Sequence, residues 1–216
     1  GPSLCLENPT RSPRLMNVLP DEAIYPPVIE VTLPRSMTVI PFGTAEAQIA
    51  AENEDGTATW RYTCNSTGGI LYAGDYVRRD IQAGGITIEF YYGRRHQAIM
   101  EESGAEEAVK AVAEYCTSHY GPLSFGAGGS LKLIQSRVVG GGYATAGASL
   151  LDEADFTAAN LNDTGKGAAA GEVMIHELVH QWWGLGNMFD TPDPAGSWSS
   201  EGLTVYTTYR IAKELY

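Results

Sequence analysis

Short runs of apolar and polar residues alternate through the first half of the chain, and proline, glycine, asparagine and aspartate separate them. The runs that alternate in this way or carry β-branched residues are Val28–Leu33, Ala47–Ala50, Thr57–Tyr62 and Ile86–Tyr91. A period of two places successive side chains on opposite faces of a sheet, so each run predicts a strand. Asp55 and Gly56 between two runs indicate a hairpin, and another strand is expected after Gly74. We therefore expect an antiparallel β region over residues 21–98.

The spacing of apolar residues becomes helical in the second half. Val109 and Val112 belong to one helical face, and Gly121 followed by proline ends the expected helix. Leu131–Gln135 then predicts a strand, and the small polar segment Leu161–Gly171 predicts a flexible connection.

The order of these elements predicts an α+β fold class. We expect residues 1–20 to be a tag scar and linker, because the chain opens with a sequence like a protease-cleavage scar. The change of pattern predicts two regions, a β region over residues 21–98 and a second region with helices over residues 99–216.

An apolar helical stretch in the second half contains the pattern H-E-x-x-H, formed by His176, Glu177 and His180. Residues four apart lie one above the other on an α-helix, so the two imidazoles can bind one ion. Glu177 projects to the flank, where a carboxylate can accept a proton from a metal-activated water. The alternative interpretation has no metal, with the three polar side chains hydrogen-bonded in a core. Burying a glutamate that binds no ion, however, costs free energy. We therefore expect one Zn²⁺ ion, with Glu177 as the general base.

Catalytic zinc usually takes three protein ligands, so one more must come from elsewhere. Trp183 and Gly186 occupy the positions where a metzincin would have glycine and histidine, which excludes that continuation. Glu201 follows Ser199 and Ser200, which suit a helix cap, and a carboxylate in a first turn suits the helix dipole. Glu201 is thus either a helix-start acid or the third ligand. With the motif present, we expect it to complete a His, His, Glu set.

Composition restricts the partners. The chain has 216 residues, 44% of them hydrophobic, and a formal net charge of -12. This acidic balance argues against nucleic acid, which needs clustered lysine and arginine. No apolar run is long enough for a membrane span, and no signal-peptide pattern opens the sequence. The 3 cysteines are widely spaced and define neither a disulfide framework nor a metal site.

One known family resembles the chain around the motif. The matching residues are His176-Glu177-Leu178-Val179-His180-Gln181-Trp182-Trp183-Gly184, followed by Glu201-Gly202. They resemble the gluzincin zinc metallopeptidases of the aminopeptidase N type. The gap before Glu201 is two residues longer than in that family, and the loop 188–197 can absorb the extra length. Over residues 25–216, the resemblance implies the end of a β domain, the start of a thermolysin-like catalytic domain, and a peptide substrate.

The chain departs from the family at the substrate strand. The family has a Gly-Ala-Met-Glu-Asn segment whose glutamate holds the free amino group of the substrate. The matching segment begins Gly141-Gly142-Tyr143-Ala144, so Ala144 stands where the family has glutamate. We expect these four residues to bind a peptide as an added strand. The acids Asp152, Glu153 and Asp155 could replace the missing glutamate, but they suit a helix start better.

The sequence ends in a helical pattern without a C-cap glycine or proline, so we expect an excised piece of a longer protein. The resemblance implies an oxyanion-stabilising tyrosine beyond residue 216, and Tyr206 and Tyr209 are expected to be core or supporting residues. The primary hypothesis is a zinc-dependent peptide hydrolase. The alternative is a gluzincin-like binding or assembly module of a larger protein, with little or no hydrolysis. By resemblance alone, the parent would be a membrane-anchored bacterial protein.

Overall fold

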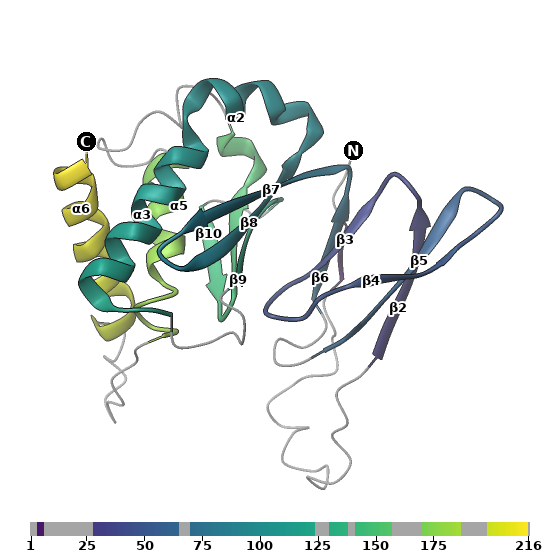
Figure 1. The fold of residues 1–216 in the computed structure, drawn as a ribbon, viewed down its shortest axis with the longest axis horizontal. Coiled ribbons are helices and arrows are strands. Elements are labelled where there is room, and N and C mark those ends of the chain that lie inside the picture. The colour runs from purple at the N-terminus through teal and green to yellow at the C-terminus, as the bar shows by residue number, and fades with distance from the viewer. Residues whose placement is uncertain are drawn as a thin grey trace, which may run out of the picture. The chain divides into compact units, whose positions relative to one another are not determined.

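The structure, a computed structural model, describes residues 4–6, 28–64, 70–123, 130–137, 141–156, 170–186 and 198–215. Its contacts divide the chain into two compact units, Gly1–Tyr76 and Val77–Tyr216. Strands form the described part of the first unit, and the second combines a sheet with helices, so the fold class is α+β as the sequence predicts (Figure 1). Apart from residues 4–6, the expected linker lies outside the described residues, as does the loop 188–197. The expected connection Leu161–Gly171 also lies outside them, except for its last two residues, which belong to a helix and not to a flexible segment.

Two antiparallel three-stranded sheets form the described part of the first unit. One has the order β1-β6-β3, from Leu4–Leu6, Leu71–Gly74 and Thr38–Pro41. The other has the order β2-β5-β4, from Val28–Pro34, Thr57–Thr63 and Gln48–Glu52. The expected hairpin joins β4 and β5, where Gly56 has a φ of 84° and Asp55 accepts hydrogen bonds from Thr57. The alternation of β2 places every second residue against a core around Val39 and Leu71.

A five-stranded mixed sheet lies at the centre of the second unit, in the order β10-β11-β9-β8-β7. Its strands are β7 (Tyr76–Ala83), β8 (Ile86–Gly93), β9 (Ser130–Ser136), β10 (Gly142–Thr145) and β11 (Ala148–Asp152). β8 and β11 both pair parallel with β9, and β10 pairs antiparallel with β11.

The second unit therefore begins before the boundary at residue 98 that the sequence analysis expects, because β7 and β8 belong to its sheet. The antiparallel pairing expected for this region is found in both sheets of the first unit, whereas β8 pairs parallel with β9, which lies outside residues 21–98. The physical reason is that the parallel partner of β8 comes only after a helical crossover. Local alternation identifies a strand but does not identify its partner.

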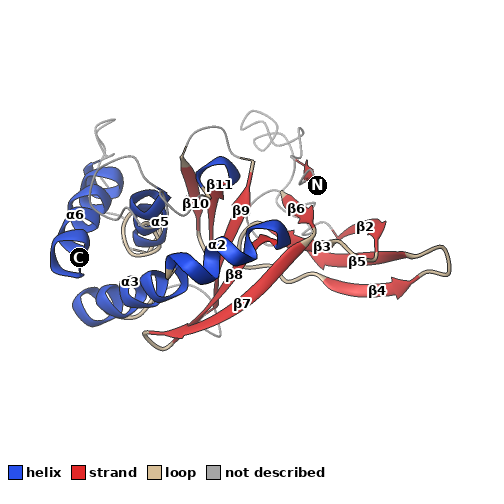
Figure 2. Cartoon of the chain, turned by 90° about the horizontal axis from the view of Figure 1, so that it is seen from above, coloured by secondary structure: helices blue, strands red, loops and turns tan. Residues whose placement is uncertain are grey.

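The described helices of the second unit follow in chain order. They are α2 (Gln97–Ser103), α3 (Ala105–Tyr120), α5 (Ala170–Val179) and α6 (Leu203–Leu215). The helix expected from the pattern is α3, which ends at Gly121, where φ is 89° and the backbone N–H donates to the carbonyl of Thr117. Helices α3, α5 and α6 contact one another at one end of the unit (Figure 2). Among the described helices, none has the length and apolar character needed to cross a membrane.

One hydrophobic core joins these helices to the sheet. Ile88 and Phe90 of β8, Val109 and Val112 of α3 and Leu178 of α5 are buried together in it. Burying each such side chain stabilises the fold by about 1.5–3 kcal/mol. The core therefore fixes α5, and the motif that α5 carries, against the sheet.

Candidate metal centre

Helix α5 presents the two histidines of the motif on one side. Ile175 and Leu178 are fully buried in the core and fix the orientation of the helix. The backbone N–H of His180 donates to the carbonyl of His176 over 3.1 Å, so helical geometry continues to the second histidine although α5 ends at Val179. The centroids of the two imidazole rings lie 4.6 Å apart. The four-residue spacing brings the rings together as the sequence predicts.

The chain turns away from the helix directly after His180. The next two backbone N–H groups each bond a carbonyl three residues back, which tightens the last turn. The indole N–H of Trp183 then donates to Thr207 Oγ1 of α6 over 3.0 Å. Gly184 follows with a φ of 87°, a conformation that favours glycine. The segment after His180 therefore holds the end of α5 against α6.

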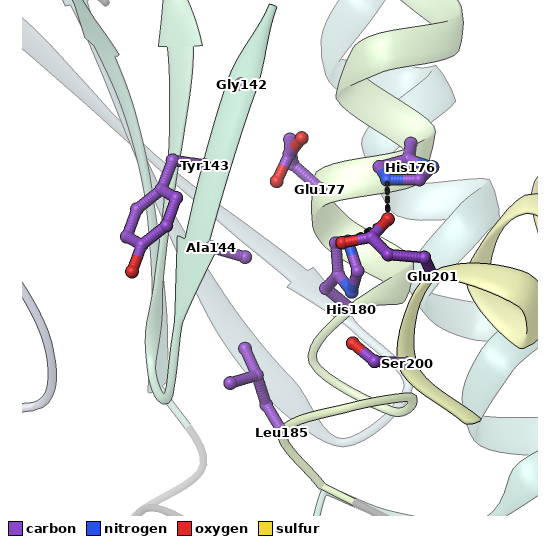
Figure 3. Close-up of a pocket in the computed structure, with 9 residues that line it drawn as sticks. All are labelled: Gly142, Tyr143, Ala144, His176, Glu177, His180, Leu185, Ser200 and Glu201. Atoms are coloured by element: carbon purple, nitrogen blue, oxygen red, sulfur yellow. Dashed lines mark ion pairs between the residues drawn. The ribbon is translucent and has the colours of Figure 1, made fainter. Parts of the chain in front are cut away.

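Glu201 approaches both imidazoles from a different element. It lies in a π-helical turn, Trp198–Gly202, that leads into α6, whereas the sequence predicts the first turn of an α-helix. The Oε2 atom of Glu201 is 3.3 Å from Nε2 of His176 and 3.4 Å from Nε2 of His180 (Figure 3). One ligand atom from each of the three residues lies within 4.8 Å of the others. These residues therefore form a group that could hold a metal ion.

The distances fit a tetrahedral zinc site. Zinc bonds to imidazole nitrogen and carboxylate oxygen are about 2.0–2.2 Å long, so neighbouring ligand atoms of a tetrahedron lie roughly 3.3–3.6 Å apart. The two N–O separations, 3.3 and 3.4 Å, fall in this range. Two imidazoles and one carboxylate also leave a fourth position open, as catalytic zinc sites do.

Hydrogen bonding fixes which nitrogen carries the proton in the neutral ring of His180. Its Nδ1 atom lies 3.2 Å from the carbonyl oxygen of Trp183, and a carbonyl can only accept. Nδ1 therefore donates, with Thr204 Oγ1 also 3.2 Å away, and the lone pair of Nε2 faces Glu201. A lone pair that faces a carboxylate oxygen at 3.4 Å is repelled by it unless a cation or a proton lies between them. A metal ion would meet this requirement.

Burial controls the protonation of two groups at the site. It is the main cause that lowers the pKa of His176, and the neighbouring His180 lowers it further. The neutral imidazole that results is the form that binds metals. Burial is also the main cause that raises the pKa of Glu177, to about 8, and Glu201 adds to the rise. A cation bound beside Glu177 would lower that pKa again.

A pocket of about 330 Å³ lies beside the three ligand residues. Its described lining is Gly142, Tyr143, Ala144, His176, Glu177, His180, Leu185, Ser200 and Glu201 (Figure 3). The side chain of Glu177 projects from α5 toward strand β10, and a Cβ atom on Gly142 would be 2.3 Å from the Cγ atom of Glu177. The glycine therefore leaves space for the carboxylate.

The structure places three of the four residues expected to bind substrate in the wall of this pocket, namely Gly142, Tyr143 and Ala144. The fourth, Gly141, is not part of the described lining, and its carbonyl accepts a hydrogen bond from the N–H of Asp152. These residues belong to or precede β10, the last strand at one edge of the described sheet. The pocket thus joins the metal ligands to an edge strand.

Leu185 and Ser200 also line the pocket, although sequence reasoning does not single them out as site residues. Ser200 carries a signal, because it directly precedes the proposed ligand Glu201. Leu185 carries none, since a single leucine after Gly184 follows no pattern. Its position depends on how the chain leaves α5.

Two of the three acids considered as substitutes for the missing glutamate have other partners, and the side chain of the third, Asp155, lies outside the described part of the structure. Asp152 accepts a hydrogen bond from the N–H of Ala154 and caps a 3-10 turn. Glu153 forms ion pairs with Arg95 and Arg137, the latter over 3.5 Å. Neither acid is in the described pocket lining. Both match the expectation of helix-start acids.

Two tyrosines of α6 lack one of their two expected roles, that of core residues. Tyr206 and Tyr209 are 59% and 57% exposed, so they are not core residues. The buried side of α6 is formed instead by Thr204, Thr207, Thr208 and Ile211. Trp182 is buried and donates from its indole to the carbonyl of Gly121, whereas Trp198 is 52% exposed.

Comparison with solved structures gives the class of fold. A scan against protein-family models and a search of curated proteins found no match. The chain is similar to a variant of a two-domain M1 zinc metallopeptidase bound to L-arginine, with 20% identity and a TM-score of 0.55. It is also similar to the M1 zinc metallopeptidase of Deinococcus radiodurans, with 21% identity and a TM-score of 0.55. A variant of the Deinococcus radiodurans protein bound to a Tyr-Ser-Ala substrate matches with 19% identity and a TM-score of 0.54.

Each of these three matches covers 87% of this chain but only 40% of the matched chain. At this level of identity the likeness is one of fold. It shows that the chain has the fold of part of an M1 zinc metallopeptidase.

Gly184 provides a test of how the third ligand is positioned. A Cβ atom there would lie 2.1 Å from Ser200 Oγ and 3.1 Å from Ser200 Cα. We predict that Gly184→Ala displaces Ser200 and the adjacent Glu201, and weakens zinc binding by about tenfold or more. The measurement is competition for zinc against a chelating indicator.

Gly85→Ala is the matched control, because Gly85 also has a positive φ, 77°, but its Cβ would meet nothing within 4 Å. This variant carries the backbone strain without the steric contact, and it should bind zinc as the parent does. Equal zinc affinity in the two variants would contradict the role of Gly184.

Proposed function

We propose that this chain carries the zinc site of a peptide hydrolase. The observation that supports this most strongly is the convergence of His176, His180 and Glu201 beside a pocket that also contains Glu177. The fold likeness to M1 zinc metallopeptidases supports the same class of reaction. Because the chain spans 40% of the length of those structures, the activity of the whole protein belongs to the proposal.

The residues of the site would have different roles in hydrolysis. His176, His180 and Glu201 would hold the ion. When bound, zinc supplies a Lewis acid that polarises a carbonyl group and makes water more acidic. Glu177 takes a proton from the attacking water and delivers it to the leaving amine. Burial raises the pKa of Glu177 to about 8 without a cation, and a bound cation would lower this pKa, which favours the ionised carboxylate that can accept a proton.

The edge strand supports a peptide as the substrate. In the described sheet, β10 pairs with β11 on one side and is the last strand on the other. The outer backbone groups of such a strand can pair with an extended peptide, which gives affinity without reading side chains. Gly142 and Ala144 have little bulk, so a peptide paired with β10 can approach Glu177 closely.

Metal content is the first test. We predict that the purified protein binds about one zinc ion per chain and that a chelator removes it, because three ligands converge before binding. His176→Ala and His180→Ala should each abolish retention after dialysis, measured by elemental mass spectrometry. His119→Ala is the control, since that ring bonds the carbonyl of Tyr115 over 2.9 Å on α3. Full zinc content in the double histidine variant would show that the ion binds elsewhere.

Substitution of the general base tests the chemistry. Glu177→Gln should keep zinc, because the side chains have the same shape and Glu177 is not a proposed ligand. It should slow hydrolysis by about 10²–10⁴, the usual contribution of a positioned proton acceptor. The rate is measured by mass spectrometry on a peptide mixture, with the 216-residue chain and with any longer chain that contains it.

Two results would argue against the proposed chemistry. Hydrolysis by Glu177→Gln at the parent rate would remove Glu177 from the mechanism. If the protein without substitutions binds zinc but cleaves no peptide, this result would favour the alternative, a binding or assembly module.

The lining of the pocket also predicts whether the enzyme prefers a peptide with a free N-terminal amine. Among its described lining residues, the carboxylates are Glu177 and Glu201, and both already have roles. A substrate ammonium would lack an acidic partner there, so we predict similar kcat/KM values for one peptide with and without an N-acetyl cap. A preference for the free amine above about a hundredfold, roughly 2.7 kcal/mol, would show that another acid binds the terminus.

A further inference from the structure

Gln181 follows the second histidine directly and is fully buried, yet it is not part of the ligand group. Its Oε1 atom accepts a hydrogen bond from the N–H of Gly147 over 3.1 Å. Its Nε2 atom lies 3.0 Å from the carbonyl of Thr145, 3.0 Å from Ser149 Oγ and 3.4 Å from the carbonyl of Ala148. Because the Gly147 N–H can only donate and the carbonyls can only accept, these partners fix the orientation of the amide.

All of these partners belong to the hairpin that forms the pocket wall. Thr145 is the last residue of β10, and Gly147 lies in the two-residue turn that leads to β11. Ser149, in β11, also donates from its hydroxyl to the backbone carbonyl of Glu177 over 2.7 Å. The hairpin is thereby bonded to the chain at both Glu177 and Gln181.

We propose that Gln181 is a positioning residue that sets the distance between the peptide-binding strand β10 and the metal ligands. The inference rests on the proposed function, because it assigns β10 to the peptide. An amide suits this position because it donates and accepts at once. An apolar side chain would leave the buried N–H of Gly147 and the carbonyl of Thr145 without this partner.

The consequence for activity follows from geometry. A displacement of about 1 Å between a bound substrate and a catalytic group can lower the rate substantially. Gly142 and Ala144 of β10 face Glu177 across the pocket, and the contacts of Gln181 lie at the end of the same strand (Figure 3). Loosening the hairpin should therefore weaken the binding of a peptide more than the binding of the metal, whose ligands come from α5 and the turn before α6.

The test compares two variants in zinc-loaded 216-residue protein that also carries Glu177→Gln, so that peptide is not consumed. Gln181→Met keeps the length of the side chain and removes its hydrogen bonds, and Ser149→Ala removes only the Ser149 contacts. Gln135→Met is the matched control, because Gln135 is also a buried amide but bonds Gly93 and His96. Zinc affinity is measured by indicator competition, and affinity for an acetylated and amidated alanine hexapeptide by NMR titration. Hydrogen exchange of backbone amides is followed by mass spectrometry.

We expect Gln181→Met to keep zinc affinity within about threefold of the parent and to lose about tenfold in peptide affinity, equal to 1.4 kcal/mol. Exchange of the amides in residues 142–149 should accelerate by about tenfold, and the control should change neither binding constant. Ser149→Ala should act in the same direction with a smaller loss. If Gln181→Met does not fold, Ser149→Ala decides the test alone.

Two results would overturn the proposal: peptide affinity within twofold of the parent in a folded variant, or a loss of zinc as large as the loss of peptide. Failure of the proposed function would give a different result: the protein with Glu177→Gln as its only substitution would bind neither zinc nor peptide. In that case hydrogen exchange still tests the role of Gln181. Unchanged exchange in residues 142–149 of Gln181→Met would show that the amide does not hold the hairpin.

Discussion

The packing of the end of α5 against the start of α6 is the interaction on which the metal centre depends. His176 and His180 are four residues apart on one helical segment, but the third ligand lies 21 residues beyond His180 in the sequence and could be far away in space. Trp183 bonds Thr207 of α6, and Gly184 permits the close approach of the turn that carries Glu201. A single hydrogen bond contributes only about 1 kcal/mol. These contacts act together because they fall within one short segment, and they place a carboxylate beside both imidazoles.

The electrostatics of this arrangement favour a cation. The pKa of His176 is lowered by burial, and the bond from Nδ1 of His180 to a carbonyl directs its Nε2 lone pair at Glu201. Atoms that offer only lone pairs repel one another at these distances. Glu177 is buried close by, with a raised pKa caused mainly by desolvation. A divalent ion would remove the repulsion because it binds the lone pairs, and it would offset the desolvation of Glu177 because it stabilises the nearby carboxylate.

The sequence predicts the local half of this site well. The pairing of His176 with His180 follows from helical spacing alone, and α3 and the hairpin at Gly56 follow from equally local signals. Glu201 could be proposed only from the chemical need for a third ligand, because its approach depends on tertiary packing. The exposed Tyr206 and Tyr209 were not predictable in this way, since α6 buries threonines that a hydrophobic pattern counts as polar.

The other features that the sequence does not predict also depend on contacts between distant segments. The parallel pairing of β8 with β9 is decided by a crossover, and no local alternation encodes it. Gln181 contributes to the site through a hairpin more than thirty residues earlier in the chain, so its sequence neighbours give no sign of its partners. Residues whose roles depend on contacts between distant segments therefore become visible only in the folded protein.

The central claim is that two imidazoles and one carboxylate from two helical elements bind a single zinc ion. X-ray absorption at the zinc edge of the loaded protein tests it most directly. The account predicts two imidazole nitrogens and oxygen ligands at about 2.0–2.2 Å, with loss of a carboxylate contribution in Glu201→Gln. A sulfur ligand at about 2.3 Å, or a spectrum without imidazole scattering, would contradict it.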